Sequence, residues 1–315
     1  MNNFAAFQTL TNRNIKLYFK DKTTFFMSLI TPLILLVLFV TFLRNVYIGT
    51  LESVLPEGIA IGDEIINGFL GGWFMSSILG VSCVTVAFCS NITMVQDRIS
   101  GTVSDILVTP VHKNTLSLSY FVANYITTLI ICLVAMCIGF IYLASVGWFL
   151  SWSDILLILG DILLCTLFGT SLAAVAEYFI NSQGGISAAA TLVSSMYGFV
   201  CGAYMPISQF AMGIRNFISF VPGTYGVVLL RNHYMQGAFE SISQLLPADA
   251  VTLLKDMFDN HIYFLGHQVQ NWTMYVILGG CAILLITVYI LLNISKSKTA
   301  KSTSLHSKSK RSGNI

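Results

Sequence analysis

Two carboxylates lie inside long apolar stretches of the sequence, where a charge is costly. Asp161 and Glu177 both belong to the stretch 155–177, and an ionisable residue at membrane depth usually faces protein or water and often serves a transport pathway. They are 16 residues apart, so on a helix they point about 160° from one another and a proton relay through both is not expected. Glu177 marks the end of the stretch, and Asp161 is the candidate for lining or gating a pathway.

Neither a catalytic nor a metal-binding pattern is found in the sequence. The Gly-rich loop followed by Lys and Ser or Thr, which cradles ATP phosphates, is absent. We therefore expect that the chain is not an enzyme and has no cofactor of its own. The seven cysteines lie in apolar runs without the spacing of metal ligands, so the expected metal ligands are none. The histidines are expected in loops and in the tail: His112, His233, His261, His267 and His306.

The composition is that of a membrane protein. Of the 315 residues, 55% are hydrophobic and only 10% are charged, and the mean hydropathy is +0.77. A soluble domain has about 25% charged residues, and so few charges could not cover the surface of a soluble globule. The composition also excludes a nucleic-acid binder, a disordered chain and a disulfide-stapled secreted domain.

Six apolar stretches are long enough to cross a bilayer as helices, which takes about 20 residues. Each must be helical, because an open strand cannot satisfy its backbone in lipid. The fold class predicted is an all-α polytopic membrane protein, with a transmembrane domain at residues 25–294. The six expected spans are 25–43, 69–95, 119–143, 155–177, 185–205 and 272–292.

The distribution of charge predicts the topology. Six spans place both termini on one side, and twelve of the 16 basic residues fall on that side: four before the first span, two in the loop after the second and six in the tail. The positive-inside rule then predicts a multi-pass protein of the cell (cytoplasmic) membrane with both termini in the cytoplasm. The Lys- and Ser-rich tail, residues 295–315, is predicted to be a basic disordered arm that touches anionic headgroups.

Residues 1–24, before the first span, predict an amphipathic helix. Such a helix lies in the cytoplasmic interface of the membrane, either as a plain anchor or as an elbow helix that forms part of a docking surface. At 100° per residue, one face collects Phe4, Phe7, Thr11, Asn14, Ile15 and Tyr18 and the opposite face collects Arg13, Lys16 and Lys20.

The loop after the second span, residues 94–110, predicts a short cytoplasmic helix. Thr102 followed by Asp105 resembles a capping box, with Asp in place of Glu or Gln, and Pro110 should end the helix. Three apolar residues form a stripe at helical spacing: Val103, Ile106 and Leu107. A short helix here could be a lever for an outside partner, and an ordinary tight loop is the alternative.

The region 205–237 is too apolar for a plain loop, yet it is broken at Pro206, Pro222 and Gly223. Neither half can span a bilayer alone, which favours re-entrant half-helices on the outer side over a folded outer loop. The span before it is rich in small residues, from Gly184 to Gly198, which allow close helix packing or a dimer interface.

Two segments together resemble the ABC-2 type transporter permeases. The run Gln-Asp-Arg-x-x-Gly-Thr-x-x-Asp-x-Leu-x-Thr-Pro at 96–110 is similar to the cytoplasmic loop of that family. The run Cys-Gly-x-Tyr-Met-Pro at 201–206, followed by Phe-Val-Pro-Gly-Thr-Tyr at 220–225, Arg231 and Gly237, resembles the end of the fifth span and the outer half-helices. The chain departs from the family at Gln96, where an acid is common, and in the outer stretch 240–270, which has no counterpart that we can align.

The resemblance implies the transmembrane permease subunit of an ATP-driven ABC exporter. It implies a second permease copy or a homologous permease, and a separate ABC ATPase subunit that binds ATP and Mg. The residues implied in coupling to the ATPase are Asp97, Arg98, Gly101, Thr102, Asp105, Leu107 and Pro110. The candidates for the substrate pathway or gate are Asp161, Tyr197, Tyr204, Pro206, Pro222 and Arg231.

The sequence indicates the class of the transported substrate only in outline. Spans lined by aliphatic residues and Phe, with few acids, favour an amphipathic or lipophilic substrate such as a drug, a lipid or a hydrophobic peptide. A lipid-linked glycan is the alternative cargo. From other classes, a proton-coupled secondary carrier, supported mainly by Asp161, and a membrane scaffold without transport remain open. The outward direction is implied by the resemblance alone.

Overall fold

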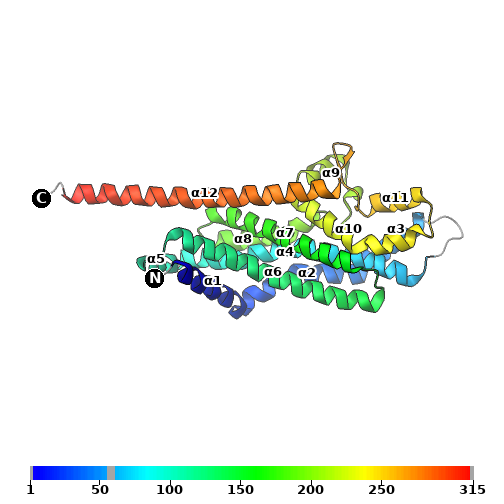
Figure 1. The fold of residues 1–315 in the computed structure, drawn as a ribbon, viewed down its shortest axis with the longest axis horizontal. Helices are drawn as coiled ribbons and strands as arrows, with labels where there is room; N and C mark the ends of the chain where they lie inside the picture. The colour runs from blue at the N-terminus through cyan, green and yellow to red at the C-terminus, as the bar shows by residue number, and fades with distance from the viewer. Residues whose placement is uncertain (1–2, 55–60, 313–315) are drawn as a thin grey trace.

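The computed structural model describes residues 3–54 and 61–312, and nearly all of them form helices. The helices make an elongated bundle, and both ends of the chain lie at one end of it (Figure 1). We call this the proximal end; it also holds α5 (Thr102–Val108). The opposite, distal end holds α3 (Arg44–Val54), α9 (Met212–Ser219) and α11 (Ala248–Met257).

The bundle is built around α4 (Asp63–Ile99), whose most apolar stretch is 83% buried. This helix contacts α2 (Lys22–Leu38), α6 (Lys113–Val146), α7 (Trp152–Ala176) and α8 (Gln183–Val200). Glycines allow the closest approaches: Gly169 of α7 lies against the Cys83 carbonyl so tightly that a Cβ would overlap it. Small residues thus let α4 become the core of the molecule.

Within the described residues, five helices are long and apolar enough to cross a membrane. They are Lys22–Leu51, Asp63–Ile99, Lys113–Val146, Trp152–Phe179 and Asn271–Ser295. The prediction of an all-α polytopic membrane protein is therefore confirmed. The first of these helices is only 19% buried and the last 17%, so their apolar side chains are available to lipid.

The predicted fifth span differs from the others. Its helix, α8, is 18 residues long and ends before residue 205, because Gly202 takes a left-handed conformation with φ +70° and the chain turns there. Gln183, four Ser and Thr residues and three glycines lower the hydropathy of α8, which is not among the five apolar helices. The six-span arrangement in detail therefore stays a prediction.

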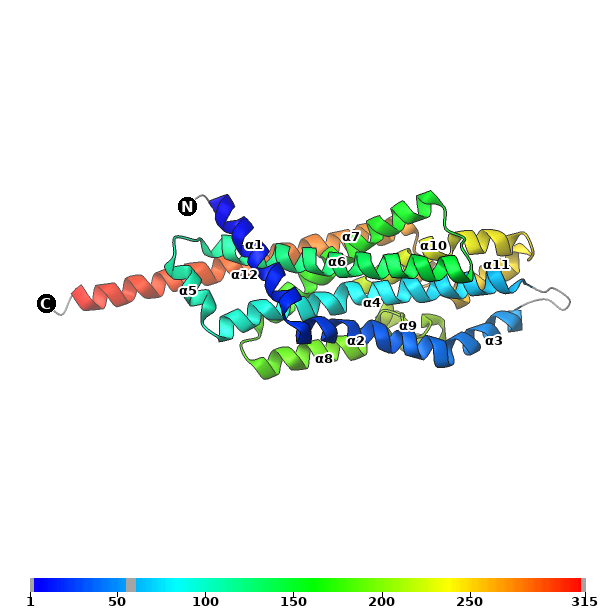
Figure 2. The ribbon, with the colours of Figure 1, turned by 90° about the horizontal axis from the view of Figure 1, so that it is seen from below.

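The N-terminal helix α1 (Asn3–Lys20) crosses the bundle obliquely and packs on α6 (Figure 2). Its buried residues include Thr11, Asn14 and Tyr18, which belong to the predicted apolar face. Asp21 separates α1 from α2, and its carboxylate accepts hydrogen bonds from the backbone N–H groups of Thr23 and Thr24. The amphipathic pattern therefore predicted the helix, and the predicted face is buried at Thr11, Asn14 and Tyr18 but not at Phe4, which is 70% exposed.

The distal end is more helical than the sequence indicated. After η3 (Ile207–Gln209) and α9, α10 (Pro222–Ser243) begins with its proline at the first turn, where the missing N–H costs nothing. It is buried among α4, α7 and α12 (Asn271–Ser312). The predicted second half-helix of about a dozen residues is thus a 22-residue helix. Beyond α11, a two-stranded hairpin, β1 (Tyr263–Phe264) and β2 (His267–Gln268), leads into α12.

The last helix continues through the basic segment as far as Ser312. The sequence predicted a disordered arm at 295–315, so the described part of this segment differs from the prediction. No Gly or Pro lies between Gly280 and Ser312, so this segment contains neither of the two residue types that most strongly disfavour a helix. Residues 313–315 lie outside the described part, as do residues 1–2 of the predicted elbow segment.

Candidate coupling and transport sites

The turn between α4 and α5 is made by Gly101, whose φ is +84°. The predicted capping box of Thr102 and Asp105 is wrong, because Gly101 is the N-cap and Thr102 is the first helical residue. Backbone N–H groups of Ser104 and Asp105 donate to the Gly101 carbonyl, and the Thr102 hydroxyl pairs with that of Ser100 at 2.8 Å. Only glycine takes this conformation readily, so Gly101 sets the direction of α5.

The apolar stripe of α5 faces the protein itself. Val103, Ile106 and Leu107 pack against a cluster that includes Leu116 and Tyr120. The residues that face outward are instead Ser104, Asp105, Val108, Thr109 and Pro110, and Val108 is 88% exposed. The helix ends at Val108, before Pro110 as predicted. A partner at the proximal end would therefore meet Asp105 and Val108, whereas Leu107 holds α5 in place.

Asp97 connects the end of α4 to α1 and α6. Its carboxylate accepts two hydrogen bonds from the Arg13 guanidinium, at 2.5 and 3.1 Å, and one from the Tyr120 hydroxyl at 2.5 Å. The hydrogen bond to Asp97 raises the pKa of Arg13 above its usual value, against the effect of burial. Paired guanidinium and carboxylate groups of this geometry are the strong class of ion pair, so α1 is anchored to α4.

Arg98 connects the same end of α4 to the link between α7 and α8. Its Nη1 donates to the carbonyls of Tyr178 and Ile180, at 2.8 and 3.1 Å. The link contains the short helix η2 (Glu177–Phe179), and the Glu177 carboxylate there accepts a hydrogen bond from the Asn91 amide at 2.9 Å. Glu177 thus ends the fourth span, as predicted. Two adjacent residues of α4 therefore hold α1 on one side and the start of α8 on the other.

Asp161 is fully buried and has two partners. One oxygen lies 2.6 Å from His233 Nδ1, and the other accepts a hydrogen bond from the Tyr275 hydroxyl at 2.5 Å. The three residues come from α7, α10 and α12. The structure places Asp161 in a packed network, and His233 is a buried helical residue where the sequence predicted a loop.

Arg231 is also fully buried and anchors the distal end. It pairs with Asp259 at 3.4 Å, donates to the Gly202 carbonyl at 2.9 Å, and its guanidinium carbon lies 4.9 Å from the ring centre of Trp73. Asp259 in turn accepts hydrogen bonds from the backbone N–H groups of Ile207 and Ser208. Arg231 therefore ties α10 to α4, to the turn after α8 and to the loop after α11.

The two predicted pathway tyrosines pack the end of α8 against its neighbours. The Tyr197 hydroxyl fills the space beside Gly223, at the start of α10. The Tyr204 ring covers Gly198, and its hydroxyl donates to the Ser194 carbonyl at 3.3 Å. With Pro206 buried and Pro222 at the first turn of α10, the predicted gate residues other than Asp161 surround one joint between α8 and α10.

Comparison with known families agrees with this arrangement. The ABC-2 type transporter model matches residues 5–235, which run from α1 into α10 and include α5 and its anchors. The chain belongs to the ABC-2 type transporter family. Permeases of this family generally work with an ABC ATPase subunit. No curated protein matches the chain.

The permease has a groove of about 340 Å³ between α2 and α8, over α4. One wall is apolar, with Met27, Ile30 and Ile34 from α2. The opposite wall carries small and hydroxyl side chains from α8: Ser187, Ala190, Thr191, Ser194 and Ser195. Of the residues that the sequence offers for lining a pathway, Ser194 lies in this groove, and Asp161, Tyr197, Tyr204, Pro206, Pro222 and Arg231 do not. The only feature of the sequence that pointed to this groove is the high content of small residues in α8, and that feature is equally typical of close helix packing.

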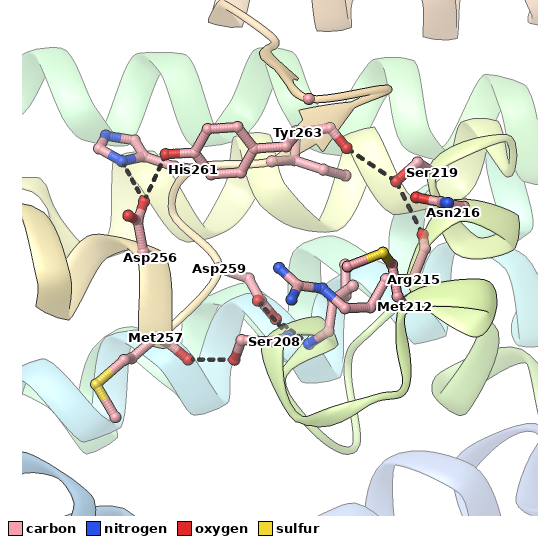
Figure 3. A pocket seen from close by; sticks show the side chains of 13 residues that line it. Ser208, Met212, Arg215, Asn216, Ser219, Asp256, Met257, Asp259, His261 and Tyr263 are labelled. Atoms are coloured by element: carbon pink, nitrogen blue, oxygen red, sulfur yellow. Dashed lines mark hydrogen bonds and ion pairs between the residues drawn. The ribbon is translucent and has the colours of Figure 1, made fainter.

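The permease also has a cavity of about 370 Å³ at the distal end, between α9, the end of α11 and the hairpin (Figure 3). Asp256 lies on one side, where its carboxylate contacts His261 Nδ1 at 2.8 Å and the Tyr263 hydroxyl at 3.0 Å. Arg215 and Asn216 lie on the other side. Charged and polar side chains alternate there with apolar ones such as Met212 and Met257, and the lining comes partly from within the family match and partly from the segment after it.

Proposed function

We propose that this permease is the membrane subunit of an ATP-driven exporter that moves an amphipathic or lipophilic substrate, such as a drug, a lipid or a hydrophobic peptide, out of the cell. ATP and Mg bind to a separate ABC ATPase subunit, so this chain is not itself an enzyme and has no cofactor. The observation that carries the proposal is the proximal platform: α5 with its outward Asp105 and Val108, beside an end of α4 that Asp97 joins to α1 and Arg98 joins to the link before α8.

The contacts of α5 and of Arg98 suggest how a displacement of α5 is transmitted to the membrane helices. The α5 helix packs on α4 and α6 through its apolar stripe, and Arg98 joins α4 to the carbonyls just before α8. Closure of the ATPase pair on ATP would move α5 and α1 together and shift the start of α8. Only contacts that differ between the two states can drive the change, and a shift of α8 would alter the groove that this helix lines.

The groove supports the choice of cargo. Its α2 wall is apolar and its α8 wall carries hydroxyls, which suits a substrate with one apolar and one polar side. The single carboxylate predicted for the pathway, Asp161, is already bound to His233 and Tyr275. A cation would therefore find little to bind there, which favours an amphipathic substrate over a small ion.

The exporter is proposed to sit in the cell membrane with both termini in the cytoplasm. The excess of Lys and Arg before α2, between α4 and α6 and in the C-terminal segment supports this orientation. The proximal end would then face the cytoplasmic ATPase and the distal end the outside. A second permease copy, or a homologous permease, would complete the transport unit.

The experiment is transport into inverted vesicles that contain the permease with and without its ABC ATPase partner. ATP and a pH gradient are supplied separately. The expected result is uptake of a lipophilic dye only with ATP and only with the ATPase present. Uptake on the pH gradient alone, without any ATPase, would overturn the exporter and support a proton-coupled carrier.

A further inference from the structure

A second distal cavity, of about 400 Å³, opens between α10, α11, β2 and the start of α12. Its volume falls in the range of small-molecule sites. It lies almost wholly in the segment that follows the family match, which ends at residue 235. We call this cavity the carboxamide pocket, because six carboxamide side chains line it: Asn232, Gln236, Asn260, Gln268, Gln270 and Asn271.

Three of these amides form a hydrogen-bonded chain. Asn260 Nδ2 donates to Asn232 Oδ1 at 3.0 Å, and Asn232 Nδ2 donates to Asn271 Oδ1 at 2.9 Å. At one end, Asn260 Oδ1 has no partner among the described residues, although Asn260 is only 4% exposed. At the other end, the exposed Asn271 offers an N–H group. Turning all three amides by 180° exchanges the two ends, so one end always donates and the other always accepts.

The remaining groups of the pocket keep it close to neutral. Gln236 and Gln268 are exposed, and Gln236 Nε2 donates to Glu240 at 3.3 Å, which leaves its carbonyl oxygen for a ligand. One acid, Glu240, is offset by one base, Lys255. Lys255 covers the Phe239 ring, with Nζ 5.3 Å from its centre, and Val251 and Val269 complete an apolar part of the wall beside the amides.

This chemistry selects the class of ligand. An apolar ligand would bury amide groups without partners, which is costly, and an anion would call for more cations than the single Lys255. A ligand whose groups both donate and accept matches a wall of alternating amide N–H and C=O groups, and hydroxyls do both. Several hydroxyls on a compact neutral frame make a sugar. A sugar ring offers apolar C–H faces as well as hydroxyls, so the mixed wall of amides and apolar side chains suits it.

We propose that the carboxamide pocket binds a neutral saccharide, either free or as the headgroup of a glycolipid. Asn271 supplies a donor at the exposed end of the amide chain, whose other end is fixed by the buried Asn260, and Gln236 and Gln268 bind further hydroxyls. The site gives a role to the distal segment 240–270. It belongs to the permease alone and does not depend on ATP-driven export.

The test is binding to the purified full-length permease in nanodiscs, without any ATPase. The probes are a panel of neutral mono- to tetrasaccharides, measured by calorimetry, and monoglucosyl-diacylglycerol, measured by native mass spectrometry against phosphatidylglycerol. The double variant Gln236→Leu/Gln268→Leu removes two exposed amides and should leave the fold intact. The matched control is Gln209→Leu, an exposed amide outside the pocket.

The expected result is binding by the wild type and by the control, and binding about tenfold weaker in the double variant, since each lost hydrogen bond costs a few-fold in affinity. Binding of free saccharides identifies a soluble ligand, and binding of the glycolipid alone identifies a headgroup. Two results overturn the proposal: no probe binds the wild type above the phosphatidylglycerol level, or the double variant binds as well as the control. Because ATP is absent, neither result bears on the exporter.

Discussion

The charged residues buried in the bundle are held by partners from other helices. Asp161 is bound by His233 and Tyr275, and Arg231 is bound by Asp259 and the Gly202 carbonyl. A buried charge that loses its partner costs several times more than the net value of the pair. Both networks include α10, so this helix is fixed in the bundle by polar contacts as well as by packing.

The first prediction concerns Asp161. Asp161→Asn keeps a carbonyl for Tyr275 and supplies an N–H for His233, so we expect ATP-driven export to continue, with a change in substrate preference at most. Asp161→Leu leaves both partners unpaired and should lower the free energy of unfolding by about 2–4 kcal/mol. The measurements are uptake into inverted vesicles and thermal unfolding in detergent. Loss of ATP-driven transport in a well-folded Asp161→Asn variant would show that the carboxylate itself is needed.

The second prediction concerns the pH dependence of stability at Asp259, in the loop after α11. Burial raises the pKa of Asp259 from 3.8 to about 6, although Arg231 and two backbone N–H groups lower it. Between these two pH values the folded protein holds more protons than the unfolded chain, so the contribution of Asp259 to stability falls as the pH rises through this window.

The Asp259→Asn variant is the matched control, because Asn tolerates the positive φ of 54° at this position. The measurement is the midpoint of thermal unfolding in detergent between pH 4 and pH 7. The wild-type midpoint, relative to that of the variant, should fall with rising pH. A difference that stays constant, or that grows with pH, would mean that Asp259 is not protonated in the folded protein below pH 6.

At the scale of the element, the sequence predicted α5 and its end but not which of its faces packs against the rest of the chain. Val103, Ile106 and Leu107 have helical spacing, and Pro110 ends the helix as expected. An apolar stripe does not say whether its partner is the same chain or another one, and here it is the cluster around Leu116. The capping box failed for a local reason, because the left-handed φ of Gly101 moves the N-cap to the residue before Thr102.

The third prediction follows from the outward face of α5. Val108→Asp places a charge at an exposed apolar position, and we expect copurification with the ABC ATPase and substrate-stimulated hydrolysis to fall about tenfold, because a charge buried in an interface is costly. Leu265→Asp, at an exposed position of the distal hairpin, is the matched control and should behave as the wild type. Normal partner binding by Val108→Asp would remove this face from the docking surface.

The fourth prediction distinguishes binding of the ATPase from the coupling of ATP hydrolysis to transport through α5. Proline holds φ near −65°, whereas Gly101 has φ +84°, so Gly101→Pro should reorient α5. A charge at Leu107 should likewise break its packing on Leu116 and Tyr120. Both variants should insert into the membrane and lose coupling of ATP hydrolysis to transport. Substrate-stimulated hydrolysis at wild-type levels in both would show that α5 is not the coupling element.

At the scale of the molecule, the sequence predicted the apolar helices well and their contacts poorly. Hydropathy identifies a span because lipid acts on every residue of it. The contacts that hold the proximal platform join residues far apart, such as Arg13 with Asp97 and Arg98 with Tyr178. Nothing local distinguishes these residues from others of their type. The same holds for the pairing of Asp161 with His233, and for the chain of amides in the carboxamide pocket.

In the proposed transport unit, the exposed faces of α2 and α8 are where we expect two permeases to meet. The apolar part of the first span is only 19% buried, and α8 exposes Leu192, Met196 and Phe199 beside its small residues. Small residues allow helices to approach closely in the membrane. Two copies that meet along these faces would enclose the groove between α2 and α8, so that each copy supplies part of its lining.

The last prediction tests this contact by substitution and by crosslinking. Ser194→Trp fills the groove, and Ala189→Trp blocks close approach on the same helix, so both should reduce transport far more than expression. Cysteine at Ser195, which is exposed on α8, should form a disulfide between copies in native membranes, in a background that lacks the exposed Cys137. Cysteine at Leu156, exposed on α7, should not. If α8 positions fail to crosslink while a control pair of known contact succeeds, α8 lies outside the interface and the groove faces lipid.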